Sequence, residues 1–363
     1  MRLLPLMLLA CQAPDPLAAV PPGLHVVVKP SAFAPVLDGL ARLSGTRIGA
    51  AVEEQRPAIL RCPELAWLSV TAGNAAVSCT PSPELAPLVA ETRTHDLAFI
   101  LPDPGIGRLW GYGDVDDAGG LQVVASMTEV AQASAYDLIL PSGEDPGPDV
   151  LPRAGALVHA RVAQARIADV AALASDSAHE NDIFGFQNQL FAATMLSGKW
   201  EVALWGVPEG GKVPRIALAV GVRSPELARA AAEQYVGVLA ERWHVQPRDT
   251  TVAGAAASCL EGLNLLPELA PCWTVRGDHF VAGWNAATLE HGLSPSQHHE
   301  TRSRITINLH EFAAADAALT HAFAPGAPPP AVVWPWRQVT LTGTQKDGRL
   351  WLELHAPASG SPP

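Results

Sequence analysis

The sequence predicts an α+β fold in which antiparallel sheets built from hairpins carry helices on one face. Two observations predict it. Short runs of alternating residues flank Gly- or Asp-containing turns, and apolar strands enter helical segments at three places. Hairpins outnumber the helical crossovers that a parallel sheet needs. The 363 residues are 48 % hydrophobic, which is enough for a sizeable core in about two domains.

The first residues have the layout of an export signal. Met1 and Arg2 form a basic start, residues 3–10 are apolar, and Cys11 follows a small residue. An apolar run this short cannot span a bilayer, which takes about 20 residues, whereas this layout is typical of a signal peptide. The sequence Leu8-Leu9-Ala10-Cys11 resembles the lipobox of bacterial lipoproteins.

The resemblance implies cleavage after Ala10, a diacylglyceryl group on the Cys11 sulfur and acylation of the new N-terminus. It also implies that Gln12 favours the outer membrane. Residues 1–10 are then the signal peptide, and residues 11–23, with four prolines, form an extended tether. We expect a lipid-anchored protein of the bacterial cell envelope, and the alternatives are a secreted or a cytosolic protein.

The charge balance bears on the partners of the chain. There are 24 Lys and Arg residues against 36 Asp and Glu residues, which gives a formal net charge of −12. No run of basic residues occurs anywhere in the chain. We therefore expect no binding to nucleic acid, because such binding depends on clustered positive charge.

Four cysteines follow Cys11, and an even number in an exported chain favours disulfides. Four cysteines allow three pairings. We expect Cys62–Cys79 and Cys259–Cys272, because each pair flanks one short segment in its own half of the chain. Buried free thiols are the alternative.

Recurring segments predict an internal duplication. Pro-Glu-Leu-Ala at Pro63 returns at Pro267, and the turn at Gly73 returns at Gly277, both 204 residues later. The three strand-to-helix segments are residues 25–43, 157–173 and 305–323. We expect a first lobe over residues 24–148, a joint at residues 145–152, a second lobe with an insertion over residues 149–357, and a disordered tail over residues 358–363.

Residues 200–222 are predicted to form a hairpin that turns at residues 209–211. Its second strand alternates large apolar residues with the small residues Ala217, Ala219 and Gly221. A small-residue face permits close packing of a helix, and we expect that helix to be residues 225–242, which begin with a Ser-Pro-Glu start signal.

The C-terminal hairpin has the clearest pattern. A two-residue turn at Asp347-Gly348 pairs Thr344 with Trp351. One face then carries Val339, Leu341, Leu352 and Leu354, and the other carries Thr340, Thr342, Thr344, Trp351, Glu353 and His355. This alternation predicts one buried and one solvated face. Trp351, with Trp334 and Trp336, is a candidate binding surface; the alternative is that the latter two cover Trp351.

The histidines and serines bear on two classes of chemistry, metal binding and nucleophilic hydrolysis. Six of the twelve histidines lie in residues 279–321, where His298, His299, Glu300 and His310 are candidate metal ligands, although no HxH or HExxH spacing occurs. A polar loop is the alternative. The chain has no GxSxG motif of a nucleophilic hydrolase, and we expect no cofactor.

The layout as a whole resembles large envelope lipoproteins of unknown function. We expect a non-catalytic binding or scaffolding module whose partner is an unknown protein. The alternatives are a carrier of an apolar ligand between sheet and helices, and a metal-dependent hydrolase that uses the histidines of residues 279–321.

Overall fold

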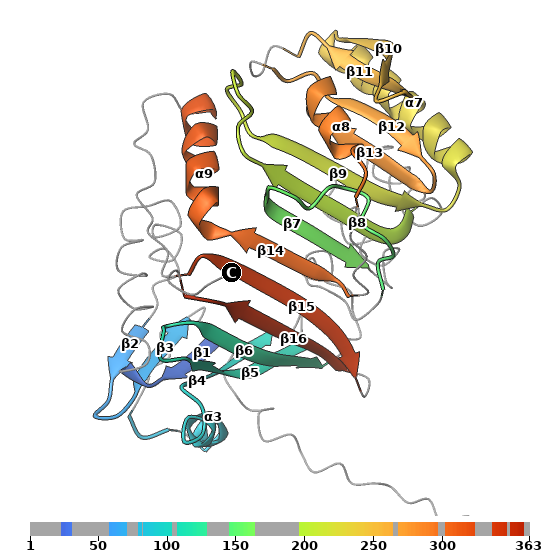
Figure 1. The fold of residues 1–363 in the computed structure, drawn as a ribbon. Helices are drawn as coiled ribbons and strands as arrows, with labels where there is room; N and C mark the ends of the chain where they lie inside the picture. The colour runs from blue at the N-terminus through green and yellow to red at the C-terminus, as the bar shows by residue number, and fades with distance from the viewer. Residues whose placement is uncertain are drawn as a thin grey trace, which may run out of the picture.

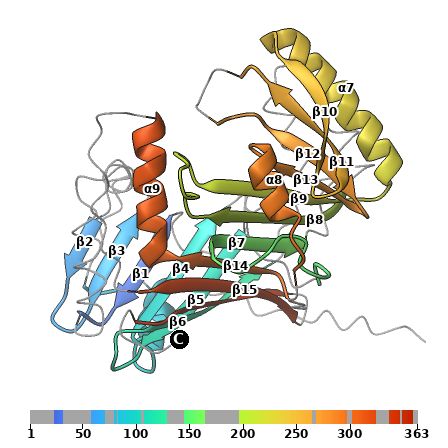
Figure 2. The ribbon, with the colours of Figure 1, turned by 45° about the horizontal axis from the view of Figure 1, so that its top comes forward.

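The described part of the chain forms one long antiparallel sheet with helices on both of its faces (Figures 1 and 2). A computed structural model describes residues 23–30, 58–70, 79–81, 83–103, 107–128, 145–163, 196–263, 268–296, 302–323, 336–346 and 349–358. The expectations for Cys11, Trp334, His298, His299 and Glu300, and for residues 1–22 of the signal and tether, lie outside these residues.

The sheet has sixteen strands, and each neighbouring pair is antiparallel, as the fold class predicts. Their order across the sheet is β10 (Gln246–Val252), β11 (Ala255–Glu261), β12 (Cys272–Arg276), β13 (His279–Gly283), β9 (Arg215–Val222), β8 (Leu196–Trp205), β7 (Ala156–Ala163), β14 (Arg304–Asn308), β15 (Gln338–Lys346), β16 (Arg349–Ala356), β6 (Leu121–Thr128), β5 (Gly107–Val115), β4 (Leu97–Asp103), β1 (Leu24–Val28), β3 (Ala66–Val70) and β2 (Ala58–Arg61).

The sheet continues from the first expected lobe into the second. β6 pairs along its whole length with β16, from Leu121 opposite Ala356 to Thr128 opposite Arg349. The two expected lobes therefore share one sheet, with this strand pair as their connection. Ala358, expected in the disordered tail, is buried and forms a bridge with Trp336.

The described residues contain four helices, and they lie on both faces of the sheet. They are α3 (Ala86–Glu91), α7 (Pro225–Trp243), α8 (Ala286–Gly292) and α9 (Leu309–Phe323). In β13, Val281 packs with Leu289 of α8, whereas Phe280 packs in the cluster of Val236 in α7. Adjacent residues of a strand point to opposite faces, so α7 and α8 cover opposite faces. The expectation that all helices pack on one face is wrong.

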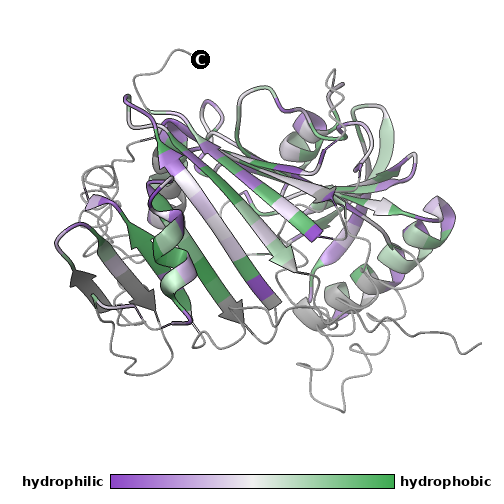
Figure 3. Ribbon diagram, turned by 90° about the horizontal axis from the view of Figure 1, so that it is seen from below, coloured by the Kyte–Doolittle hydropathy of each residue, from purple (hydrophilic) through white to green (hydrophobic). Residues whose placement is uncertain are grey.

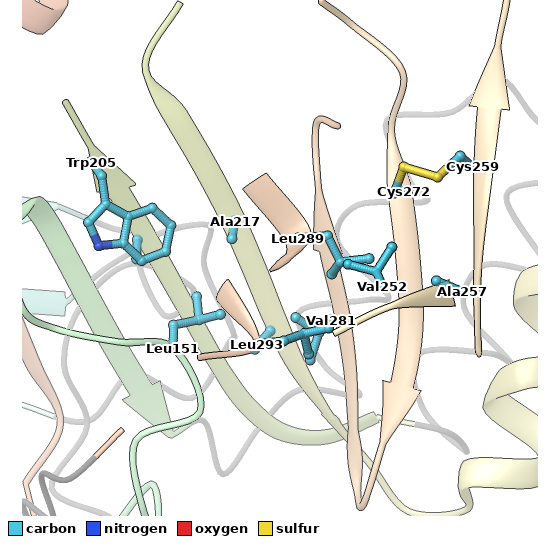
Figure 4. Packing of buried hydrophobic residues seen from close by; sticks show 12 residues of the cluster. Leu151, Trp205, Ala217, Val252, Ala257, Cys259, Cys272, Val281, Leu289 and Leu293 are labelled. Carbon is cyan, nitrogen blue, oxygen red and sulfur yellow. A yellow bond between two sulfur atoms is a disulfide. The ribbon is translucent and has the colours of Figure 1, made fainter. Parts of the chain in front are cut away.

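The prediction that α7 packs on the small-residue face of β9 is also wrong. Residues 200–222 form the β8–β9 hairpin, and α7 begins as predicted, with Ser224 Oγ accepting a hydrogen bond from Leu227 N. However, Ala217 packs with Leu289 (Figure 4), and Ala219 belongs to the same cluster, which contains no residue of α7. The short helix α8 takes this place because it follows β13, the strand that pairs with β9.

Both expected disulfides are confirmed. The Cα atoms of Cys62 and Cys79 lie 5.5 Å apart, and those of Cys259 and Cys272 lie 4.0 Å apart. The second pair joins directly opposed residues of β11 and β12 within the largest apolar cluster (Figure 4).

The strand-to-helix segment at residues 305–323 is confirmed as β14 followed by α9. For the other two segments the strands β1 and β7 are confirmed, and residues 31–43 and 164–173 lie outside the described residues. The turn at Gly277 joins β12 to β13 as predicted, whereas the turn at Gly73 lies outside them.

Candidate functional site

An open groove of about 630 Å³ lies over four consecutive strands near the middle of the sheet, β14, β15, β16 and β6. Figure 3 shows hydrophilic and hydrophobic residues alternating along strands of this sheet. The side chains that line the groove are mostly polar or charged: Gln122, Arg302, Arg304, Asn308, Arg337, Gln338, Thr340, Thr342, Glu353 and His355.

The C-terminal hairpin supplies the floor of the groove in the predicted register. Thr340 lies opposite His355, Thr342 opposite Glu353, and Thr344 opposite Trp351. This register confirms the predicted polar face. The alternating pattern therefore determines which side of β15 and β16 faces the groove.

The groove lies on the sheet face that α3 and α8 cover at its two sides. Opposed residues of neighbouring strands point to the same face. One such row crosses the sheet through Ala98, Tyr112, Val124, Glu353, Thr342, Arg304, Arg161, Glu201 and Ala219. Ala98 packs in the cluster of α3, and Ala219 in that of α8. Glu353 and Thr342 lie between these two covered regions.

The groove concentrates positive charge in a chain whose net charge is −12. Among the described residues that line it, three are arginines and only Glu353 carries a carboxylate. Arg302 and Arg337 are exposed. Arg304 is half-buried, and its Nε donates to Thr306 Oγ1 at 3.0 Å. Guanidinium groups bind carboxylates and phosphates through paired hydrogen bonds.

The arginines lie at both ends of β14. Arg302 and Arg304 are at its start, and Arg337 is next to its end, where Leu309 N donates to Arg337 O at 2.9 Å. The four residue steps from Arg304 to Asn308 correspond to roughly 13 Å of strand. The positive charges are thus spread along the groove.

A buried cluster of charges continues the same face beyond the groove. Arg161 of β7 lies opposite Arg304, and its guanidinium lies 2.6 Å from Asp149 Oδ1. Beside it, His159 Nε2 lies 2.8 Å from Glu201 Oε1. Burial raises the pKa of the Asp149 carboxyl above 3.8, Arg161 opposes this shift, and Glu201 adds to it.

This cluster holds residues 145–152, the expected joint, against the sheet. Glu201 Oε2 accepts from Val150 N at 2.8 Å, and Glu201 Oε1 accepts from Leu151 N at 3.1 Å. Trp205 Nε1 donates to Pro152 O at 3.2 Å. The buried charged groups pair with each other, and Glu201 also accepts hydrogen bonds from backbone N–H groups. This arrangement is typical of a cluster that supports the fold.

The predicted tryptophans have different environments. Trp336 Nε1 donates to Gly119 O at 3.1 Å, in the β5–β6 turn. Trp351 is half-buried between Ser126 and Thr344 on the groove face, and its Nε1 has no hydrogen-bond partner among the described residues. Trp351 therefore flanks the groove, whereas Trp336 is held by the β5–β6 turn.

His310 is the only candidate metal ligand within the described residues, and it is exposed at the start of α9. Across the described ranges, no group of three or more His, Cys, Asp and Glu residues is placed to hold a metal ion. None of the described helices has the length and apolarity to cross a membrane.

Sequence reasoning missed the groove arginines. Arg302 and Arg304 precede the predicted strand-to-helix segment at residues 305–323, yet they continue the alternation of Thr306 and Asn308 along one strand face. That period of two is the signal that predicts them on the polar face.

Comparison of the chain with family models, curated proteins and solved structures finds no match.

Proposed function

We propose that this protein is a lipid-anchored, non-catalytic binding module of the bacterial cell envelope, and that the central groove is its binding surface. The observation that carries the proposal is the groove itself: about 630 Å³ over a part of the sheet face that the described helices leave open. A volume of this order accommodates a small molecule or one segment of a polymer.

The acid–base groups of the groove favour binding over catalysis. Glu353 and His355 are both exposed and alternate along one strand. Acid–base catalysis commonly uses groups that the protein shields from water and whose pKa values it shifts. The polar lining also argues against an apolar cargo in this groove, because such a ligand needs apolar walls.

The two disulfides support an oxidising compartment, since such bonds are rare in cytosolic proteins. Together with the lipobox-like Leu8-Leu9-Ala10-Cys11, they support export and anchoring through Cys11. We also propose the internal duplication, which the common order of helix then strand in α3–β4 and α8–β14 supports. The β12–β13 hairpin has no counterpart at β3, whose two edges pair with β1 and β2, so the proposed duplication covers only the helix and the strand that follows it.

Fatty-acid labelling tests the anchoring. Cells that express the wild-type chain or Cys11→Ser are grown with radioactive palmitate. Label in the wild type alone, with Cys11→Ser released from the membrane fraction, is the expected result. An unlabelled wild-type chain would refute the lipid anchor.

Photo-crosslinking in cells tests the binding surface. A benzoylphenylalanine at Thr342, in the groove, is compared with one at Thr251, an exposed threonine on the edge strand β10. Mass spectrometry of the purified chain should reveal adducts at position 342 that position 251 lacks. Equal adducts at both positions, or none at position 342, would exclude the groove.

A further inference from the structure

We propose that the groove binds an extended acidic oligosaccharide, that is, a short chain of sugars carrying carboxylates. This inference rests on the proposed function, because it takes the groove as the binding surface. It adds the chemical class of the ligand, which the positions of charged, neutral polar and aromatic side chains indicate.

The charge of the groove selects an anion. In the described lining, Arg302, Arg304 and Arg337 outnumber the one carboxylate, Glu353, although acidic residues exceed basic ones in the whole chain. A guanidinium group matches a carboxylate through two parallel hydrogen bonds. Arg302 and Arg337 are exposed, so a ligand can reach them without rearrangement of the sheet.

The spacing of the arginines selects an extended ligand. Arg304 and the region of Arg337 are separated by the length of β14, roughly 13 Å. One monosaccharide ring is too short to reach both ends at once. A chain of about three rings that carries a carboxylate on each matches this distance and reaches both groups of arginines.

The neutral lining selects hydroxyl groups along the ligand. Asn308, Gln338, Gln122, Thr340 and Thr342 line the groove between its charged ends. Their amides and hydroxyls donate and accept hydrogen bonds, as sugar hydroxyls require. The Thr340 hydroxyl already accepts from Gln338 Nε2 at 3.1 Å and keeps its own proton to donate.

Trp351 adds an aromatic surface at the side of the groove. It lies two residues from Glu353 on β16 and on the same sheet face. It is half-buried, and its indole N–H has no hydrogen-bond partner among the described residues. Because the indole nitrogen is itself buried, only the exposed part of the flat ring can contact a sugar ring.

Calorimetry with the full chain tests this ligand class. The probes are trigalacturonate, neutral maltotriose and inorganic phosphate, each at low and high salt. We expect trigalacturonate to bind more tightly than either other probe, and its affinity to fall with salt. Arg302→Gln and Arg337→Gln should each weaken it roughly fivefold to tenfold.

Arg248→Gln is the matched control, since Arg248 is an exposed arginine on β10 that pairs with Glu261 at 2.9 Å. It should leave the affinity unchanged. Equal binding of trigalacturonate and maltotriose, phosphate binding as tight as that of trigalacturonate, or unchanged affinity in both groove variants would overturn the ligand class. If groove-specific crosslinks at position 342 persist in cells while trigalacturonate does not bind, the ligand class fails and the proposed function remains.

Discussion

Glu201 Oε1 lies 2.8 Å from His159 Nε2, and both side chains are less than a tenth exposed. The same carboxylate accepts the backbone N–H groups of Val150 and Leu151. One side chain of β8 therefore holds Val150 and Leu151 over the sheet. Because Arg161 lies opposite both Glu201 and Arg304, this support adjoins the arginine end of the groove.

Glu201→Ala should destabilise the fold by about 3–5 kcal/mol, because it leaves buried donors and His159 without their acceptor. Urea unfolding followed by circular dichroism measures the change. Glu261→Ala is the control: Glu261 is about half exposed in its pair with Arg248, and its loss should cost less than about 1 kcal/mol. Equal costs for the two variants would contradict the supporting role of Glu201.

Asp149→Asn should change the pH dependence of stability. The pKa of Asp149 is raised above 3.8 in the folded state. At pH values between 3.8 and this folded-state pKa, the folded state therefore binds more protons than the unfolded state. The contribution of this carboxyl to the free energy of unfolding is fully present below pH 3.8 and is lost as the pH rises through its folded-state pKa.

Urea midpoints from pH 3 to pH 7 in roughly half-unit steps test this sign. The wild type should become less stable relative to Asp149→Asn as pH rises. Because the wild type and the variant share all other carboxyl groups, the difference between their midpoints reports the contribution of Asp149. A difference that grows in favour of the wild type at higher pH would contradict the raised pKa.

His291 should show the opposite dependence. Its ring lies 4.6 Å from that of Trp205 in an edge-on contact. Burial lowers its pKa below 6.5, with Arg215 adding to the shift. Stability from this group is full above pH 6.5 and is lost as pH falls through the folded pKa. NMR titration of the His291 ring should give a midpoint below 6.5, and His291→Phe should remove this part of the pH dependence; a midpoint above 6.5 would refute it.

Local patterns predicted the elements that depend on nearby residues. The register of β15 with β16 follows from alternation and a two-residue connection between Lys346 and Arg349. The α7 start at Ser224 and both disulfides also depend on short separations. Turn chemistry, capping and strand period act over a few residues, so one sequence suffices to read them.

Long-range pairings could not be read in this way. β6 meets β16 and β7 meets β14 across long separations, and no local signal specifies which edges join. The groove consequently combines residues as distant as Gln122 and Arg337. The helix that packs on Ala217 could not be predicted for the same reason. α8 reaches Ala217 only because β13 pairs with β9.

Gly283→Ala tests the close approach of α8. A Cβ at Gly283 would lie 2.7 Å from the backbone nitrogen of Leu289, so the helix must move. We expect a loss of about 1–3 kcal/mol in urea unfolding. Gly206→Ala, where a Cβ meets nothing within 4 Å, should be nearly neutral. An unchanged stability in Gly283→Ala would contradict this packing.

NMR mapping of the full chain during titration with trigalacturonate tests the central claim most directly. Amide shifts should concentrate on Arg304, Thr340, Thr342, Glu353 and His355, which belong to the groove strands, and should diminish with added salt. Shifts confined to α7, or to the region of α8 and β10–β13, would contradict the assignment of the groove as the binding surface.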